Sequence, residues 1–211
     1  MTKKKIWAGP SIRRLPSYLN IIKGRDMKGD EYISGTSIAE ELQLEAIQVR
    51  KDLALTGAMG RPKRGYAIQE LIFSIERFLC WNSEHKAAIV GAGCLGAALM
   101  GHADFKKHGL NISIAFDSDA KKVGKKVHGV EIFHIDDAEK VIKKENIKIA
   151  ILALPSEHAQ SVSDILIKAG IRGIWNFTDT KIIAADNVAV WKEDLSSGYA
   201  MLSYMMAINE G

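Results

Sequence analysis

The sequence predicts an α/β protein in three parts: an N-terminal winged helix-turn-helix domain, a Rossmann-type parallel α/β domain and a C-terminal dimerisation helix, which we expect two subunits to exchange. Two short helical patterns joined by a tight turn indicate the first part. A Gly-x-Gly-x-x-Gly motif directly after an apolar run indicates the second. An apolar helical pattern near the end of the chain indicates the third. We place the three parts at residues 1–80, 85–192 and 193–211.

Composition and charge agree with this division. Of the 211 residues, 47% are hydrophobic and 26% are charged, which excludes a disordered or collagen-like chain. The net charge is only +4, but residues 1–80 carry 14 basic and 9 acidic side chains, whereas residues 81–211 carry 15 and 16. All of the positive excess therefore lies in the first part, which suits a polyanionic partner such as DNA.

The sequence contains no pattern typical of a metal site or a membrane anchor. Cys80 and Cys94 cannot form a disulfide framework and lack the spacing of zinc ligands. No apolar run approaches the roughly 20 residues of a membrane-spanning helix. The lysine-rich N-terminus leads into Trp7 and Pro10 rather than into an apolar signal segment. We therefore expect a cytoplasmic protein that binds neither metal nor membrane.

Three helices are predicted in the first domain. Apolar side chains recur at helical spacing over residues 11–23. A Ser-x-x-Glu capping box, Ser37 to Glu40, opens a second helix that continues to Leu42. A short turn then leads to a third helix at residues 46–55. This order is that of a helix-turn-helix.

The third helix presents side chains that can bind DNA. Gln48 and Lys51 lie opposite its apolar face, with Arg50 at the flank. Gln and Arg form paired hydrogen bonds with base edges in the major groove, and Lys neutralises phosphates. A solvated surface helix carries the same residue types, so the pattern alone leaves that alternative open.

A basic wing after the third helix favours DNA binding. Residues 57–66 are punctuated by glycine and predict a β-hairpin. Its cations would reach the DNA backbone or a narrow minor groove. A further helix at residues 68–79 closes the domain. The wing cations are Arg61, Lys63 and Arg64.

The second domain opens with a nucleotide-binding motif. A strand at residues 86–90 runs into Gly91-Ala92-Gly93-Cys94-Leu95-Gly96 and then a helix. Gly91 permits a tight turn, Gly93 lets the backbone approach a pyrophosphate, and Gly96 allows close packing of helix on strand. The phosphates would lie at the helix N-terminus. An α/β domain with a glycine turn and no ligand is the alternative, and Cys94 is either a small residue that fits the turn or an oxidation-sensitive thiol.

Asp117 extends the motif. It ends a second strand, residues 111–116, and lies 21 residues after Gly96, where a carboxylate binds the ribose hydroxyls. Ser118 and Asp119 follow it without an arginine, so a 2′-phosphate would be repelled. We therefore expect NAD(H) rather than NADP(H), with Asp117 and Ser118 at the cofactor.

The rest of the domain alternates strands with helices. Strands are predicted at residues 130–133, 147–154, 173–177 and 188–191, and helices at 137–145 and 157–169. Ligands bind beyond the carboxyl ends of such strands. Candidates for the nicotinamide end are Leu154, Pro155, Ser156, Asn176 and Phe177.

The final segment, residues 193–209, predicts an apolar helix with Leu195, Tyr199, Leu202 and Met206 at helical spacing. Such a helix packs either on its own body or on a partner subunit. Because helix-turn-helix proteins commonly act as dimers on two-fold operators, we expect a dimerisation helix.

Together these motifs resemble the Rex family of redox-sensing transcriptional repressors. The resemblance implies a homodimer that binds palindromic operators when NADH is scarce and releases them when NADH rises. NAD(H) would then be an effector and not a reactant, so we expect no catalytic residues. The resemblance rests on Gln48-Val49-Arg50-Lys51-Asp52-Leu53, Gly65-Tyr66, the Gly91 to Gly96 motif, Phe116 to Asp119, His134 to Asp137 and Asn176-Phe177.

The same resemblance assigns further residues. Gln48, Arg50 and Lys51 would lie in the recognition helix, and the motif glycines with Asp117 would hold the adenosine diphosphate half. His134 and Pro155 would lie near the cofactor. In the family pattern an arginine, a tyrosine and an aspartate form a switch, and the matching positions here are Asn20, His102 and Asp194.

Two other functions remain as alternatives. One is a DNA-binding regulator that answers a different nucleotide or a CoA-like ligand, because two switch positions differ from the family pattern. The other is an NAD-dependent oxidoreductase. Residues 81–211 leave no room for the substrate domain that such an enzyme needs, which disfavours the second alternative.

Overall fold

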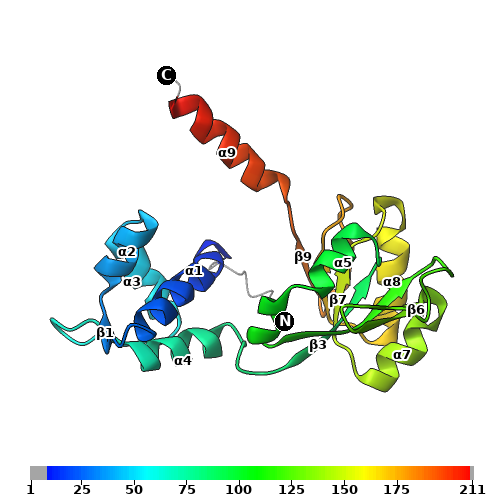
Figure 1. The fold of residues 1–211 in the computed structure, drawn as a ribbon, viewed down its shortest axis with the longest axis horizontal. Coiled ribbons are helices and arrows are strands. Elements are labelled where there is room, and N and C mark those ends of the chain that lie inside the picture. The colour runs from blue at the N-terminus through cyan, green and yellow to red at the C-terminus, as the bar shows by residue number, and fades with distance from the viewer. Residues whose placement is uncertain (1–8, 210–211) are drawn as a thin grey trace. The chain divides into compact units, whose positions relative to one another are not determined.

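The computed structural model describes residues 9–209 (Figure 1), and the chain divides into two compact units between Ser83 and Glu84. The boundary lies within the short segment, residues 81–84, that separates the first two predicted domains. Each unit has hydrophobic clusters of its own. We call residues 9–83 the head and residues 84–209 the body.

The head is a helical domain with a small sheet. Its core is built from apolar side chains of all its helices, and Tyr18, Ile38 and Leu53 are fully buried. Strand β1 (Tyr32–Ile33) pairs antiparallel with β2 (Tyr66–Ala67). The helices are α1 (Gly9–Asp26), α2 (Gly35–Leu42), α3 (Ala46–Leu55) and α4 (Ile68–Phe78). The helix-turn-helix formed by α2 and α3 has the predicted order.

The start of α2 was predicted wrongly. The N-cap is Ser34, whose backbone is extended and whose side chain accepts a hydrogen bond from the N–H of Ser37 at 2.9 Å. Ser37 is therefore already helical. The capping-box pattern misplaced the helix start by three residues because Ser34 has the extended conformation that an N-cap requires.

The wing is also less regular than predicted. Within residues 57–66 only one β-bridge forms, between Arg61 and Gly65. Lys63 adopts a left-handed φ of 60° at the turn, and Pro62 has no N–H to donate. The predicted hairpin is thus a tight closed turn, and the strand that follows it, β2, pairs with β1 instead.

The body is built on a seven-stranded sheet of order β5-β6-β4-β3-β7-β8-β9. All neighbouring pairs are parallel except β5 with β6. This confirms the predicted parallel α/β fold. The strands are β3 (His85–Val90), β4 (Leu110–Asp117), β5 (Lys126–Val127), β6 (Val130–His134), β7 (Ile149–Leu152), β8 (Gly173–Asn176) and β9 (Ala189–Lys192).

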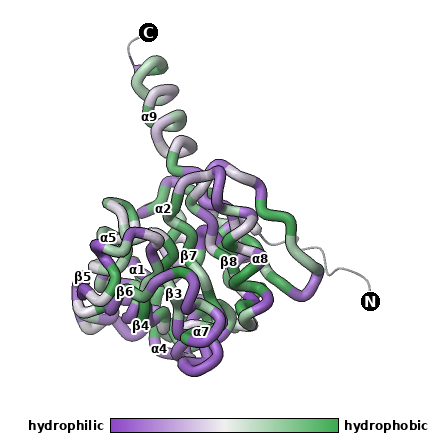
Figure 2. Tube along the Cα trace, turned by 90° about the vertical axis from the view of Figure 1, so that its right-hand side faces the viewer, coloured by the Kyte–Doolittle hydropathy of each residue, from purple (hydrophilic) through white to green (hydrophobic). Residues whose placement is uncertain are grey.

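Helices cover both faces of this sheet. Ala88 and Val90 of β3 belong to the cluster that contains α7 and α8, whereas Ala87 and Ile89 belong to the cluster that contains α5. The central strands are accordingly hydrophobic (Figure 2). The helices are α5 (Cys94–Met100), α6 (Ala103–Lys107), α7 (Ala138–Glu145) and α8 (Ala159–Ala169), with 3-10 turns η1 (Ile135–Asp137) and η2 (Ser156–His158). Neither α6 nor β5 was predicted, because elements this short show no periodicity.

The strand order creates a crevice beside β3. From β3 the chain passes first to β4 on one side and later to β7 on the other. The crossover helices therefore leave opposite faces of the sheet at this point, which is where ligands of open α/β sheets bind.

The last helix, α9 (Ser196–Asn209), buries none of its side chains within the described chain. Its large apolar side chains cover more than half of the helix circumference. They are Tyr199, Met201, Leu202, Tyr204, Met205, Met206 and Ile208, each more than half exposed.

We expect Gly96→Ala to lower the free energy of unfolding of the body by about 1–3 kcal/mol. A Cβ at Gly96 would lie 1.9 Å from the carbonyl oxygen of Gly91, whereas a Cβ at Gly93 would meet nothing within 4 Å. Gly93→Ala is therefore the matched control. Urea denaturation followed by circular dichroism measures both variants, and equal stabilities would contradict this packing.

Candidate functional site

A cavity of about 610 Å³ lies at the carboxyl ends of the central strands of the body. Its volume is in the range of small-molecule sites. The structure places six of the predicted cofactor residues on its wall: Gly91, Gly93, Asp117, Ser118, Leu154 and Pro155.

The glycine loop between β3 and α5 forms one side of the cavity. Gly91 has a left-handed φ of 101°, and a Cβ there would lie 2.2 Å from the carbonyl oxygen of Ala153. Gly91 and Gly96 are therefore required for close packing of the backbone. Gly93 instead borders open space, which a side chain would fill. The loop thus leaves bare backbone on the cavity, as the approach of a dinucleotide pyrophosphate requires.

Asp117 is fixed by three hydrogen bonds. Its carboxylate accepts from the backbone N–H groups of Ala92 and Asp119, each at 2.9 Å, and from Lys122 Nζ at 2.8 Å. Burial alone would raise its pKa, but the hydrogen bonds from Lys122, Asp119 and Ala92 outweigh burial and hold the pKa of Asp117 below its usual value. The group is therefore an ionised acceptor, as ribose hydroxyls require.

Other predicted cofactor residues lie nearby without lining the cavity. Ala92 belongs to the glycine loop, and Cys94, Leu95 and Gly96 form the first turn of α5. His134 ends β6 beside Asp117, and its Nδ1 accepts from the N–H of Asp136 at 3.3 Å. Their contact with a cofactor stays a prediction.

Asn176 is fully buried at the end of β8. Its amide oxygen accepts from the N–H and the hydroxyl of Thr178, at 2.9 and 2.8 Å, and its nitrogen donates to the carbonyl of Thr180 at 2.7 Å. These bonds hold the loop after β8, and Asn176 does not line the cavity. Its role at the cofactor also stays a prediction.

Sequence reasoning missed several residues of the cavity wall. The parallel topology was the available signal, because it brings the start of α8 to the same edge as the glycine loop. The spacing Asp117-x-Asp119-x-x-Lys122 was a second signal, since a single turn after the strand can bring the Lys122 ammonium next to the Asp117 carboxylate. The missed polar residues are Lys122, His158 and Ser161, whereas Asp119 was expected beside Asp117 only as a charge that repels a 2′-phosphate.

Of the three predicted switch residues, Asn20 is exposed on α1 of the head, and the other two lie in the body. His102 precedes α6, and its ring stacks on Phe105 with centroids 4.5 Å apart. Asp194 precedes α9 and accepts from the N–H of Ser196 at 3.0 Å. The hydrogen bonds from Ser196 hold the pKa of Asp194 below its usual value.

An aromatic row connects the surroundings of His102 and Asp194. Phe105 packs edge-on against Trp175 at 5.5 Å, and Trp175 contacts Phe177 at 5.0 Å. The indole N–H groups of Trp175 and Trp191 both donate to Glu193 Oε2 at 3.1 Å. The row therefore reaches the residue that precedes Asp194, a connection that helical or strand periodicity does not indicate.

In the head, α3 exposes the predicted DNA-binding residues. Arg50 and Lys51 are exposed and Gln48 is half-buried. Nη2 of Arg50 donates to the hydroxyl of Thr36 at 3.2 Å. The neighbouring Ile47 is 63% exposed, so an apolar side chain also stands on this face.

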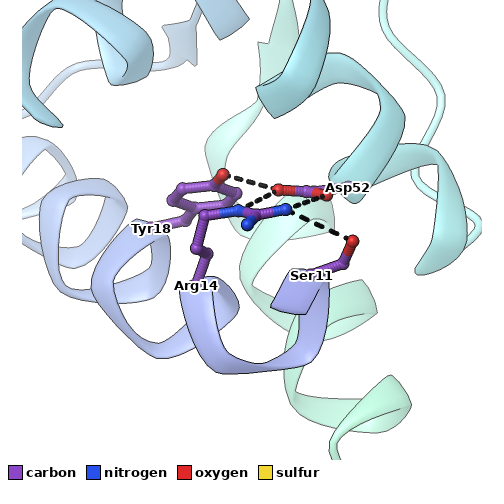
Figure 3. Close-up of polar contacts among 4 residues, drawn as sticks. All are labelled: Ser11, Arg14, Tyr18 and Asp52. Atoms are coloured by element: carbon purple, nitrogen blue, oxygen red, sulfur yellow. Dashed lines mark hydrogen bonds and ion pairs between the residues drawn. The ribbon is translucent and has the colours of Figure 1, made fainter. Parts of the chain in front are cut away.

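A buried polar cluster ties α3 to α1 (Figure 3). Asp52 is 2% exposed and accepts from Arg14 Nε at 2.7 Å, from Arg14 Nη2 at 2.9 Å and from the hydroxyl of Tyr18 at 2.7 Å. With its amide oxygen toward Arg14, Gln48 accepts from both terminal guanidinium nitrogens at 3.0 and 3.2 Å. Arg14 thus holds two consecutive turns of α3.

This cluster sets the charge state of its members. Burial raises the pKa of Asp52, but the hydrogen bonds it accepts, led by Arg14, bring that pKa below its usual value. Burial and then the bond to Asp52 raise the pKa of Tyr18 to about 12. Asp52 is therefore a buried carboxylate with a guanidinium partner, and the helical periodicity of α3 did not predict it.

Two of the three wing cations, Arg61 and Arg64, lie beside the ring of Tyr32. The guanidinium carbons of Arg61 and Arg64 lie 5.5 and 5.1 Å from the centre of its ring. Arg61 also donates to the Tyr32 hydroxyl at 2.8 Å and to Glu70 Oε1 at 3.0 Å. Arg61 is therefore anchored within the head, whereas Lys63 stands exposed at the turn.

Between residues 9 and 209, no three or more His, Cys, Asp or Glu side chains gather in a way that would hold a metal ion. No helix in this part of the chain has the length and apolarity needed to cross a membrane.

Two family models match separate parts of the chain, and several relatives match nearly all of it. Residues 8–54 match a family model described as "Putative DNA-binding protein N-terminus", and residues 82–180 match one described as "CoA binding domain". The chain is 55% identical over 206 residues to a redox-sensing transcriptional repressor Rex from Treponema denticola, covering 98% of each. It is 36% identical to that of Bacteroides fragilis, covering 95% of this chain and 91% of the relative.

Two solved structures of a Rex-family repressor called RSP are also similar. One contains β-NAD⁺ and operator DNA, with 31% identity, a TM-score of 0.89, and coverage of 98% of this chain and 95% of that one. The other contains β-NADH, with 30% identity, a TM-score of 0.87, and coverage of 98% and 97%.

We expect Asp52→Asn to lower the free energy of unfolding of the head by about 1–3 kcal/mol at neutral pH, because Arg14 loses its carboxylate partner. The folded pKa of Asp52 is depressed, so its stabilising effect is present above the unfolded pKa of about 3.9 and is lost as the pH falls through the folded value. The difference from the unaltered protein should therefore shrink below about pH 4. Urea denaturation between about pH 3 and 7 measures this.

Glu40→Gln on α2 removes an exposed carboxylate and is the matched control. A stability difference for Asp52→Asn that is absent at pH 7, or equal to that of Glu40→Gln, would contradict the role of the cluster.

Proposed function

The chain belongs to the Rex family of redox-sensing transcriptional repressors, and we propose that its head binds operator DNA when NADH is scarce and releases it when NADH rises. The observation that carries this proposal is the combination, in one chain, of a helix-turn-helix with an exposed third helix and a cavity lined by the glycine loop and Asp117. NAD(H) is an effector here and undergoes no reaction, so the protein is a regulator and not an enzyme.

The cavity fits NAD(H). Asp117 accepts hydrogen bonds from the adenosine ribose, and the bare backbone at Gly93 faces the pyrophosphate. Leu154 and Pro155 follow β7 and line the cavity on the side opposite Asp117's strand β4, where they cover the cofactor. Ser118 lines the same cavity, and we assign the remaining residues to the surroundings of the bound cofactor: Ala92, Cys94, Leu95, Gly96, His134 and Asn176.

The head fits the major groove through α3. Gln48 and Arg50 read base edges, and Lys51 contacts a phosphate. Because the Gln48 amide oxygen is held by Arg14, its nitrogen is the group left to donate to a base. Lys63 and Arg64 of the wing approach the backbone or minor groove, and Arg61 fixes the wing on Tyr32.

We propose a cytoplasmic homodimer on a palindromic operator. A helix with this many large apolar side chains needs other side chains to cover them, and α9 buries none of them within the described chain. A second copy supplies that cover most simply, because exchange of α9 satisfies both subunits at once. Two heads related by a two-fold axis then match two half-sites.

We propose that Asn20, His102 and Asp194 occupy the switch. Asn20 carries no charge, so it cannot form the ion pair with a carboxylate that an arginine at this position would form. The aromatic row from His102 to Glu193 gives the body a packed connection to the start of α9. NADH that displaces His102 would thereby alter the residues beside Asp194.

A second candidate function keeps the DNA-binding head and replaces NAD(H) with a CoA-like nucleotide. The match of residues 82–180 to a CoA-binding domain favours it. Fluorescence titration with NADH and competition by CoA separates the two candidates, since only the true effector binds at micromolar concentration.

The direct test is a gel shift on the promoter of the protein's own operon. NADH should release the unaltered protein and leave Asp117→Ala bound, because that variant keeps its head and loses a ribose contact. Complexes that are indifferent to NADH in the unaltered protein would overturn the proposed function.

We expect Lys51→Ala to weaken operator binding and to flatten its salt dependence. Each lost phosphate contact reduces the slope of log K against log salt by about 0.9. Lys140→Ala, an exposed lysine on α7, is the control and should leave the slope unchanged. Fluorescence anisotropy over a range of salt concentrations measures both, and equal slopes for the two variants would remove Lys51 from the interface.

We expect Leu202→Glu with Met206→Glu to convert the dimer to a monomer and to abolish tight operator binding. These side chains are 56% and 55% exposed on α9, so the change leaves the packing of head and body intact. Ile183→Glu, at an apolar residue 76% exposed elsewhere on the body, is the control. Sedimentation velocity distinguishes the outcomes, and a dimer that survives both charges would rule out α9 as the interface.

A further inference from the structure

A positive charge lies at the ribose end of the cavity, where the sequence predicted none. Lys122 follows β4 in a turn held by the bond from its N–H to the carbonyl of Asp119 at 2.9 Å. Its Nζ is 2.8 Å from Asp117 Oδ2, and its side chain, 38% exposed, lines the cavity together with Ser118 and Asp119. The carboxylate expected to bind the ribose is therefore already paired with a cation.

We propose that Lys122 forms a latent site for the 2′-phosphate of a phosphorylated dinucleotide, and that Asp117 keeps this site closed by pairing with Lys122. The inference rests on the proposed function, because it takes the cavity to hold the adenosine half of NAD(H). In this proposal Lys122 helps to determine the preference between NADH and NADPH. The sequence prediction considered only arginine as a phosphate ligand and therefore did not include Lys122.

The charges around the ribose explain the closure. Asp117 and Asp119 together outweigh the single ammonium of Lys122, so a phosphate with nearly two negative charges is repelled. Without the Asp117 carboxylate, the negative charge of Asp119 and the positive charge of Lys122 cancel. Asp119 Oδ1 is partly occupied, because it accepts the N–H of Lys121 at 2.9 Å.

Lys122 has the properties of a phosphate ligand. Its ammonium is a compact charge on a flexible stem, so it can turn from Asp117 to a phosphate without movement of the backbone. The hydrogen bond to Asp117 raises the pKa of Lys122 above its usual value, and the group remains charged. The hydroxyl of Ser118, on the same wall, is a second donor for the phosphate oxygens.

The experiment is fluorescence titration of the full chain with NADH and with NADPH. In Asp117→Ser we expect the ratio of Kd for NADPH to Kd for NADH to fall at least about tenfold below that of the unaltered protein. Adding Lys122→Ala should reverse this fall. Adding Lys121→Ala instead should not, because Lys121 is an exposed neighbour of equal charge that does not line the cavity.

A fall in the ratio that survives Lys122→Ala, or that Lys121→Ala reverses equally, would overturn the latent site. Lys122→Ala in the otherwise unaltered chain is an independent arm that needs no change at Asp117. There the ratio should rise several-fold, because two carboxylates then face the phosphate without a counter-charge. An unchanged ratio in that arm would also overturn the proposal.

The failure of the proposed function looks different. If the unaltered, folded protein bound neither dinucleotide, the assignment of the cavity to NAD(H) would be wrong. If it bound NADH and the variants showed no dependence on Lys122, only the latent site would be wrong.

Discussion

The cavity of the body depends on the carboxylate of Asp117. By accepting the N–H of Ala92 it joins the glycine loop after β3 to the end of β4, and by accepting Lys122 it joins the turn that follows. The loop and the turn are therefore held in place by the chain itself. A site formed in this way loses little conformational freedom when a dinucleotide binds, which favours affinity. The same contacts keep the carboxylate ionised and positioned for ribose hydroxyls.

The head uses a second buried aspartate in a similar way. Asp52 lies on α3 but is bound by Arg14 and Tyr18 of α1, so the recognition helix cannot rotate about its axis without breaking this cluster. Removal of a charge pair from water is costly, and such a pair contributes more to a defined geometry than to stability. A helix that binds base edges needs such a fixed orientation of its side chains. In both units a buried carboxylate thus fixes the segment that we propose contacts a ligand.

Features with a local cause were predictable from the sequence. The bounds of α3, the glycine loop and the parallel sheet each follow from periodicity or from a motif within one short segment. The Arg14–Asp52 pair joins residues 38 positions apart, and its partners are charged residues that periodicity assigns to the surface. Lys122 was missed because only an arginine directly after Asp117 was taken as a sign of phosphate binding. The turn that follows β4 brings the lysine, five residues later, back to Asp117. The start of α2 was misplaced because two serines, Ser34 and Ser37, competed for one cap.

We propose that NADH and operator DNA each bind best to a different conformation of the same protein. Linkage requires that, if NADH weakens operator binding by some factor, the operator weakens NADH binding by the same factor. Calorimetric titration of NADH into the free protein and into the operator complex measures this directly. We expect the NADH Kd to be at least about fivefold higher in the complex. Equal affinities in the two titrations would contradict it.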